Sequence, residues 1–194
     1  MLRDRGPNEL TNYVKEFVIF KPEDYEELRD AVKNWIVEND DSIKNYGHIS
    51  TWDTSLITNM SGLFHFDDSD IPYYEQYDEK YFSLNSFNDD ISNWDVSNVT
   101  SMSNMFSNCT DFNQPLNKWD VSKVENMSNM FSKCEDFNQP LDNWDISSVL
   151  DMTRMFYKAY QFNQNISMWD LTKIRKEKIF VSSNMEERNK PNLL

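Results

Sequence analysis

Side chains that could do catalytic chemistry are few in this sequence, and their spacing matches no familiar catalytic motif. The two histidines, His48 and His65, lie in neither a zinc-binding nor a nucleophile motif. Cys109 and Cys134 occupy the same slot of a repeat described below, as small buried side chains, where burial raises the thiol pKa and leaves the sulfur inert. The sequence also has no glycine-rich phosphate-binding loop. We therefore expect neither an enzyme nor a bound cofactor.

Aspartates recur immediately after tryptophans, and oxygen-rich repeats of this kind can bind calcium. However, the glycine-rich turn of calcium-binding nonapeptide repeats is missing. Each Asp also precedes a Ser or Thr by two residues, so its carboxylate can accept backbone amides at a turn. We interpret the series as structural and predict no metal site. These aspartates are Asp95, Asp120, Asp145 and Asp170.

A repeat of 25 residues accounts for most of the chain. Trp94, Trp119, Trp144 and Trp169 are spaced at that interval, and Trp52 belongs to the same series. Because self-similarity at a fixed period indicates stacked repeats, we expect each repeat to form one coil whose apolar face is buried by its neighbours. The apolar slots of the coil that begins at Trp94 are Val96, Val99, Met102, Met105, Phe106, Cys109, Phe112 and Leu116.

The slots from Val99 to Cys109 follow the i, i+3, i+4 spacing of a helical face, which predicts a short helix in each coil. Pro115 then favours an extended stretch leading into Trp119. The expected fold is an α/β solenoid, a leucine-rich-repeat-like right-handed stack of short parallel strands and short helices. We further predict a ladder of stacked side chains that bond the backbone of neighbouring coils, formed by Asn88, Asn113, Asn138 and Asn163.

The flanking segments suggest a cap and a tail. Residues 1–48 are predicted to be an N-terminal cap, with a strand at 14–20 and an amphipathic helix that opens at Pro22. The repeats are expected over residues 49–181, with 17 inserted residues near 65–86, and residues 182–194 form a flexible tail. The insertion combines acidic residues, a weak second candidate for cation binding, with tyrosines.

The repeat pattern W-D-x-S-x-V-x-x-M-S-x-M-F-x-x-C-x-x-F-N-Q-P-L resembles the BspA-like leucine-rich-repeat surface protein family, of the kind found in mycoplasma lipoproteins and large DNA viruses. The resemblance covers about Trp52 to Asp170. It implies an adhesion or protein-binding module without catalytic residues. The chain shows no signal peptide or lipobox cysteine, so an AT-rich large DNA virus is the source that suits it best.

The net charge of −14 makes nucleic acid and anionic membranes poor partners. No apolar run approaches the roughly 20 residues of a membrane span. We expect an intracellular protein, in the host cytoplasm or the virion if it is viral.

Protein binding is the preferred function, and a structural virion or assembly component is the alternative from another class. A cation-binding adhesin is more distant, and the oligomeric state and partner stay open. Contacts are expected from the inserted loop and from the pairs that precede each Trp, which vary while their neighbours stay fixed. The candidate contact residues are Tyr73, Tyr74, Tyr77, Asn93, Asn117, Lys118, Asp142, Asn143 and Met168.

Overall fold

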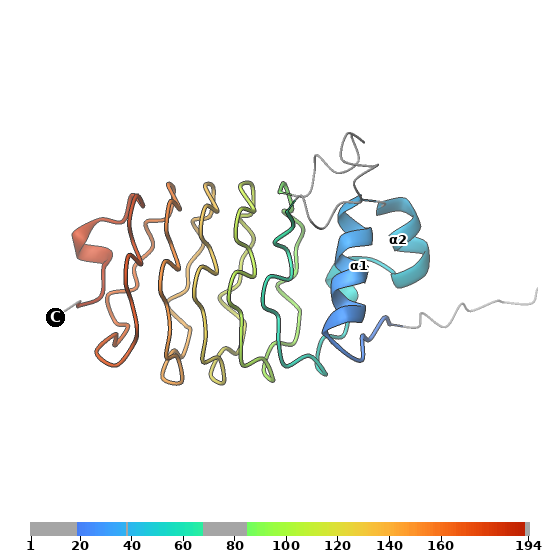
Figure 1. Ribbon diagram of the computed structural model, residues 1–194, viewed down its shortest axis with the longest axis horizontal. Coiled ribbons are helices and arrows are strands. Elements are labelled where there is room, and N and C mark those ends of the chain that lie inside the picture. Colours follow the sequence, from blue (N-terminus) through green and yellow to red (C-terminus); the bar gives the residue numbers. More distant parts are fainter. Residues whose placement is uncertain (1–18, 38, 68–84, 193–194) are drawn as a thin grey trace, which may run out of the picture.

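In the computed structural model, two helices stand at one end of a row of stacked coils (Figure 1). The structure describes residues 19–37, 39–67 and 85–192. Over these residues the helices are α1 (Tyr25–Val37) and α2 (Asn39–Tyr46), with the short 3-10 turns η1 (Ile49–Thr51) and η5 (Glu187–Asn189). Most of the predicted strand at 14–20 lies outside the described residues, and Ile19 and Phe20 belong to no strand.

Helix α1 packs its apolar face against the first coil. The Asp24 carboxylate accepts the Glu27 amide at 2.9 Å, which satisfies an amide of the first turn. Leu28, Val32 and Trp35 are buried, as their helical spacing requires. The Trp35 indole also donates to Asp89 at 2.8 Å, so the helix is tied to the chain that follows the insertion.

The coils themselves correct the predicted fold class. Within the described repeats there is no helix like the one expected from Val99 to Cys109, and no β-sheet. Isolated parallel bridges join successive coils, and the rest of each coil alternates between turns and irregular stretches such as 112–116. The protein is therefore a stack of turns, and the expected α/β solenoid of the leucine-rich-repeat type is wrong. The bridges pair Asn59 with Ser101, Ser101 with Asn126, Asn126 with Asp151, and Asp151 with Arg175.

Left-handed residues explain why the helical spacing gives no helix. Asn104 and Asn108 have φ angles of 57° and 67°, which a right-handed helix cannot contain. Each is the third residue of a four-residue turn, closed by Met105 N–H to Met102 and by Cys109 N–H to Phe106. Two consecutive turns place apolar residues at i, i+3 and i+4 as a helix does.

The amides that do not close turns join the coils. Asn104 N–H donates to Ser128 at 2.8 Å and Phe106 N–H donates to Met130 at 3.0 Å. The next coil repeats the scheme, with Asn129 N–H donating to Thr153 at 2.9 Å. Backbone bonds therefore alternate between closing a turn and holding the neighbouring coil, so few buried polar groups of the backbone are left unpaired.

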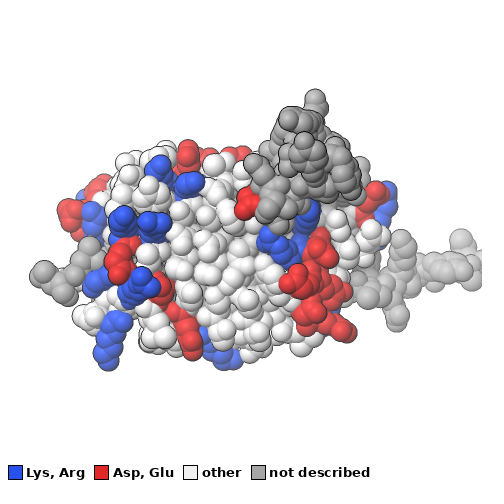
Figure 2. All heavy atoms as spheres, in the orientation of Figure 1, with Lys and Arg blue, Asp and Glu red and all other residues white. Residues whose placement is uncertain are grey.

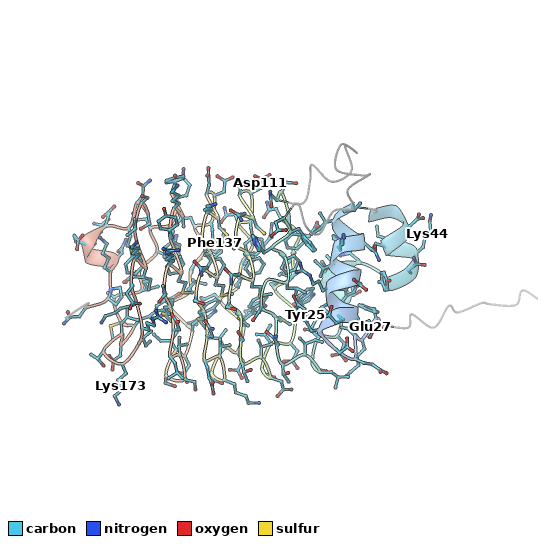
Figure 3. All side chains as sticks on the ribbon, in the orientation of Figure 1. Tyr25, Glu27, Lys44, Asp111, Phe137 and Lys173 are labelled. Carbon is cyan, nitrogen blue, oxygen red and sulfur yellow. The ribbon has the colours of Figure 1, made fainter. Side chains whose placement is uncertain are left out.

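The core is a set of aromatic columns along the stack. Phe106 and Phe131 have ring centroids 5.6 Å apart, and Phe112 and Phe137 have centroids 5.9 Å apart, with nearly parallel planes. The predicted apolar slots are buried, as expected. Figure 3 shows Phe137 inside the stack, whereas Asp111 and Lys173 lie at opposite edges. Each coil thus adds its two buried phenylalanine rings to these columns.

The predicted asparagine ladder is confirmed. The Asn88 side-chain oxygen accepts the Asn113 amide at 2.9 Å, and Asn113 accepts the Asn138 amide at 3.0 Å in the same way. Asn163 continues the ladder by accepting the Glu186 amide at 2.9 Å. The described part of the expected tail, residues 182–192, therefore makes ladder contacts with the last coil, and Met185 is buried there.

The turn geometry predicts how substitutions at Asn129 behave. Its φ is 54°, a region that β-branched residues avoid and glycine adopts freely. Asn129→Val should lower the free energy of unfolding by about 1–2 kcal/mol, whereas Asn129→Gly should change it by less than about 1 kcal/mol. Urea unfolding followed by circular dichroism measures both. Equal losses for the two variants would contradict the left-handed turn.

Candidate functional site

The predicted contact residues before each Trp lie in turns along one edge of the stack, which we call the Trp edge. Asn93, Lys118, Asn143 and Met168 occupy the same position in successive coils and are all exposed. Asn117 donates from its amide group to Asp142 at 3.2 Å and accepts the Asn143 amide at 3.1 Å. The structure thus brings these residues together. The other predicted contacts, Tyr73, Tyr74 and Tyr77, lie outside the described residues.

The aspartates after each Trp make the turn contacts expected from the sequence. Asp120 accepts the Ser122 hydroxyl at 2.6 Å and the Ser122 amide at 3.1 Å, and Asp145 accepts the Ser147 amide at 3.0 Å. These bonds hold the pKa of each carboxyl below its ordinary value. In the part of the chain that the structure describes, no three His, Cys, Asp or Glu side chains are grouped to hold a metal ion.

The cysteines and His65 have structural partners. Both thiols are buried and unbridged, and burial raises the pKa of each well above its usual range. Cys134 donates to the Phe106 carbonyl at 2.9 Å, and His65 Nδ1 lies 2.8 Å from the Ser107 carbonyl oxygen. A shallow hollow of about 540 Å³ lies beside His65, between α1 and the first turns, and Arg29 and Asp67 also line it.

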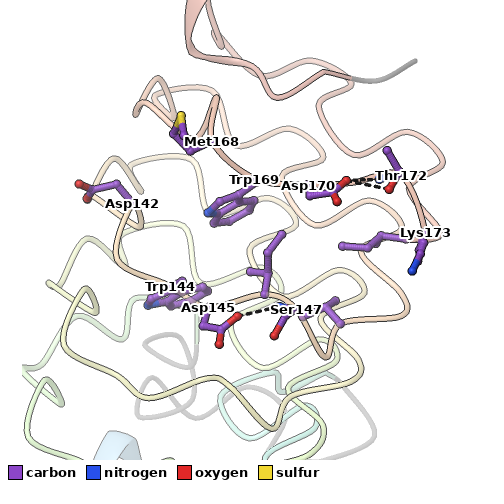
Figure 4. Close-up of a pocket in the computed structure, with 12 residues that line it drawn as sticks. Asp142, Trp144, Asp145, Ser147, Met168, Trp169, Asp170, Thr172 and Lys173 are labelled. Carbon is purple, nitrogen blue, oxygen red and sulfur yellow. Dashed lines mark hydrogen bonds between the residues drawn. The ribbon is translucent and has the colours of Figure 1, made fainter.

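A deeper cavity of about 450 Å³ lies between the Trp144 and Trp169 coils, at the end of the Trp edge (Figure 4). Of the predicted contacts, Asp142 and Met168 line it, and Asn93, Asn117, Lys118 and Asn143 do not. Met168 is 91% exposed. The other lining residues are Trp144, Asp145, Ile146, Ser147, Val149, Trp169, Asp170, Thr172, Lys173 and Ile174.

Side chains close the earlier seams between coils. A seam is the line along which two consecutive segments meet, each running from two residues before a Trp to the Val or Ile five residues after it. At the first seam Thr54 donates to the Asp95 carbonyl at 2.9 Å. At the second, Lys123 Nζ donates to the Asn98 side chain at 2.8 Å. At the third, Asn117 makes its two bonds to the next turn. Each of these three seams is therefore tied by at least one hydrogen bond from a side chain.

At the fourth seam no hydrogen bond of the described residues joins 142–149 to 167–174. At this seam Lys173 takes the position of Lys123 and Ser148 takes that of Asn98, and no hydrogen bond joins the two described side chains. The bridge from Asp151 to Arg175 also spans one residue fewer than the bridge from Asn126 to Asp151. The small residue Ser148 thus leaves this seam without the side-chain bond that Lys123 makes to Asn98.

The indole of Trp169 differs from those of the other coils. Trp94, Trp119 and Trp144 donate from Nε1 to a backbone carbonyl of a preceding coil, at 2.9, 3.3 and 3.0 Å. Trp169 Nε1 is buried without a hydrogen-bond partner. An unpaired buried donor costs about 1–3 kcal/mol, so this group gains by meeting an acceptor.

Charge inside the cavity is negative. The carboxylates of Asp142, Asp145 and Asp170 line it against the single ammonium of Lys173, counting the described lining residues. Asp170 Oδ1 accepts both the amide and the hydroxyl of Thr172, at 3.0 and 2.7 Å, which lowers its pKa. On the face drawn in Figure 2, acidic residues gather beside the helices, whereas the C-terminal coils carry several basic residues interspersed with acidic ones.

The sequence identified the edge but not the cavity. The sequence feature that could have indicated the cavity is the series Asn98, Lys123, Ser148 and Lys173. In this series a small serine stands where the other coils carry a longer polar side chain. Its meaning depends on which side chains meet across a seam, and that requires the register of the coils.

Fold and site define a non-globular repeat protein: a stack of turns with helices at one end and a cavity near the other. The chain belongs to the family described as Mycoplasma protein of unknown function, DUF285, whose model matches residues 25–71 and 75–192. No curated protein and no solved structure gives a significant match to the chain. Among the described residues no helix is long and apolar enough to cross a membrane.

The turn aspartates predict acid sensitivity. Because Asp120, Asp145 and Asp170 have folded pKa values below their ordinary one, the stability they contribute is present above that ordinary value. It is lost as the pH falls through the folded pKa. Urea unfolding should therefore show a smaller loss of stability between about pH 4 and pH 2.5 when all three are changed to Asn. An unchanged pH dependence would contradict the assigned turn bonds.

Closing the fourth seam is predicted to stabilise the protein. Ser148→Asn would let Lys173 donate to the new amide oxygen, as Lys123 does to Asn98. We expect the free energy of unfolding to rise by about 0.5 kcal/mol, the range of exposed charged pairs. The gain should vanish in a Lys173→Met background, which a double-mutant cycle measures. A gain that persists without the lysine would contradict the seam bond.

Proposed function

We propose that the protein is a non-enzymatic protein-binding module whose recognition surface is the Trp edge together with the cavity at its end. The observation that carries this proposal is Met168, a large apolar side chain that is 91% exposed on the rim of a cavity containing Trp144 and Trp169. An exposed methionine beside buried aromatic residues offers a partner an adaptable apolar anchor.

The pattern of the repeat also supports a protein-binding function. Slots that face the core repeat because packing constrains them, whereas the position before each Trp changes from Asn93 to Lys118, Asn143 and Met168. A rigid stack with a variable edge suits recognition of another protein. We also propose that the protein is related to the BspA-like surface repeat proteins, whose sequence pattern its repeat resembles. The match to a Mycoplasma protein family supports this relationship without identifying the type of repeat.

A structural assembly component is the second candidate, because on the face drawn in Figure 2 acidic residues gather beside the helices and basic residues, mixed with acidic ones, lie on the C-terminal coils. Opposite charges near the two ends favour head-to-tail association of copies. The basic residues belong to the last coil, and the acidic ones lie in or just before the first turns of α1: Lys173, Arg175, Lys176 and Lys178, against Glu23, Asp24, Glu26 and Glu27.

Selection of peptides from a random display library on the immobilised protein tests the binding module. Enriched peptides should bind at least tenfold more weakly to Met168→Asp, a loss of about 1.4 kcal/mol. Leu150→Asp is the matched control, since Leu150 is also apolar and 61% exposed but does not line the cavity. Fluorescence polarisation measures both affinities.

Two results would overturn the proposal. One is equal loss of affinity in both variants, which would remove the Trp edge from recognition. The other is the absence of any enriched peptide together with salt-sensitive oligomers in size-exclusion chromatography with light scattering, which would favour the assembly component.

A further inference from the structure

We propose that the cavity between the Trp144 and Trp169 coils takes a lysine or arginine side chain from a segment of the partner protein, with the adjoining peptide carbonyl accepting the Trp169 indole N–H. This inference rests on the proposed function and specifies the chemistry of the partner. Two independent observations converge on it, the negative charge of the lining and the unpaired donor.

The carboxylates are arranged to receive a cation. The bond from Ser147 N–H occupies Oδ1 of Asp145, and the bonds from Thr172 occupy Oδ1 of Asp170. These bonds fix each carboxylate in place and leave Oδ2 for a ligand. Asp142 adds a third carboxylate at the rim. Charge-assisted bonds to such preset carboxylates are the strong kind, so an ammonium or guanidinium group is the matching ligand.

The apolar part of the cavity fits the stem of a basic side chain. Trp144, Ile146 and Met168 line the same space as the carboxylates. Long basic side chains bury their methylene groups on apolar surface while the charged head meets polar groups, and indole rings attract cations. Lys173 opposes a cation, but it is one ammonium against three carboxylates on the lining.

The unpaired indole N–H of Trp169 is the second observation that specifies the ligand. Trp169 is 6% exposed and lines the cavity, and Figure 4 shows its nitrogen on the side of the ring that faces Asp142 and Trp144. This N–H needs an acceptor, which a bare amine does not offer. A peptide carbonyl next to the basic side chain provides it, so the two groups together specify a basic residue within a polypeptide.

NMR titration of the full chain tests the inference, with the indole N–H signals of the tryptophans as the readout. The probes are N-acetyl-arginine methylamide and N-acetyl-lysine methylamide, and their neutral counterparts are the citrulline and norleucine compounds. The Trp169 signal, identified by its loss in Trp169→Phe, should move with the basic probes. It should move at least tenfold less at equal concentrations of the neutral ones.

Matched variants locate the effect. The double variant Asp145→Asn with Asp170→Asn should weaken binding of the basic probes at least tenfold. We expect the double variant to fold, because asparagine can make the same turn bond. Asn59 and Asn126 each accept the backbone amide two residues further along the chain. Asp120→Asn, at the same position of a coil that does not line the cavity, should leave binding unchanged. Ser148→Asn should also weaken binding, by narrowing the seam, without removing a carboxylate.

Equal shifts with basic and neutral probes, or an unchanged affinity in the Asp145 and Asp170 double variant, would overturn the inference. If selected peptides still bound the Trp edge in that case, the proposed function would stand without it. If the basic probes bound as expected but no peptide were enriched in the display selection, the cation site would stand and the binding module would fail.

Discussion

The structure depends on one constraint, which is that every coil must close its own turns and also bond to its neighbour. Left-handed residues such as Asn104 and Asn108 meet it, because they reverse the backbone every four residues and release alternate amides for the next coil. The aromatic columns and the asparagine ladder depend on the register that these bonds impose. The stack therefore derives its regularity from turns, without a β-sheet in its described residues.

The candidate site arises where that regularity fails. Side chains tie the first three seams, and the fourth has neither a tie nor an acceptor for the Trp169 indole. The cavity lies at this fourth seam, and Met168 stands at its rim. Repetition explains folding, and the departure from repetition supplies the chemistry that a partner can recognise.

The sequence predicted contacts better than it predicted backbone shape. Burial of the repeated slots, the ladder from Asn88 to Asn163 and the turn role of the aspartates all follow from residue type at fixed spacing. The helix and the strand were wrong, because consecutive four-residue turns reproduce helical periodicity and only φ distinguishes them. The cavity could not be predicted, since it depends on the register between Ser148 and Lys173 in separate coils.

Hydrogen–deuterium exchange of the protein with a bound display-selected peptide tests whether recognition occurs at the fourth seam. We expect the added protection to be confined to the lining segments, 142–149 and 168–174. Protection centred on the coils of Trp94 and Trp119, or on α1, would contradict it.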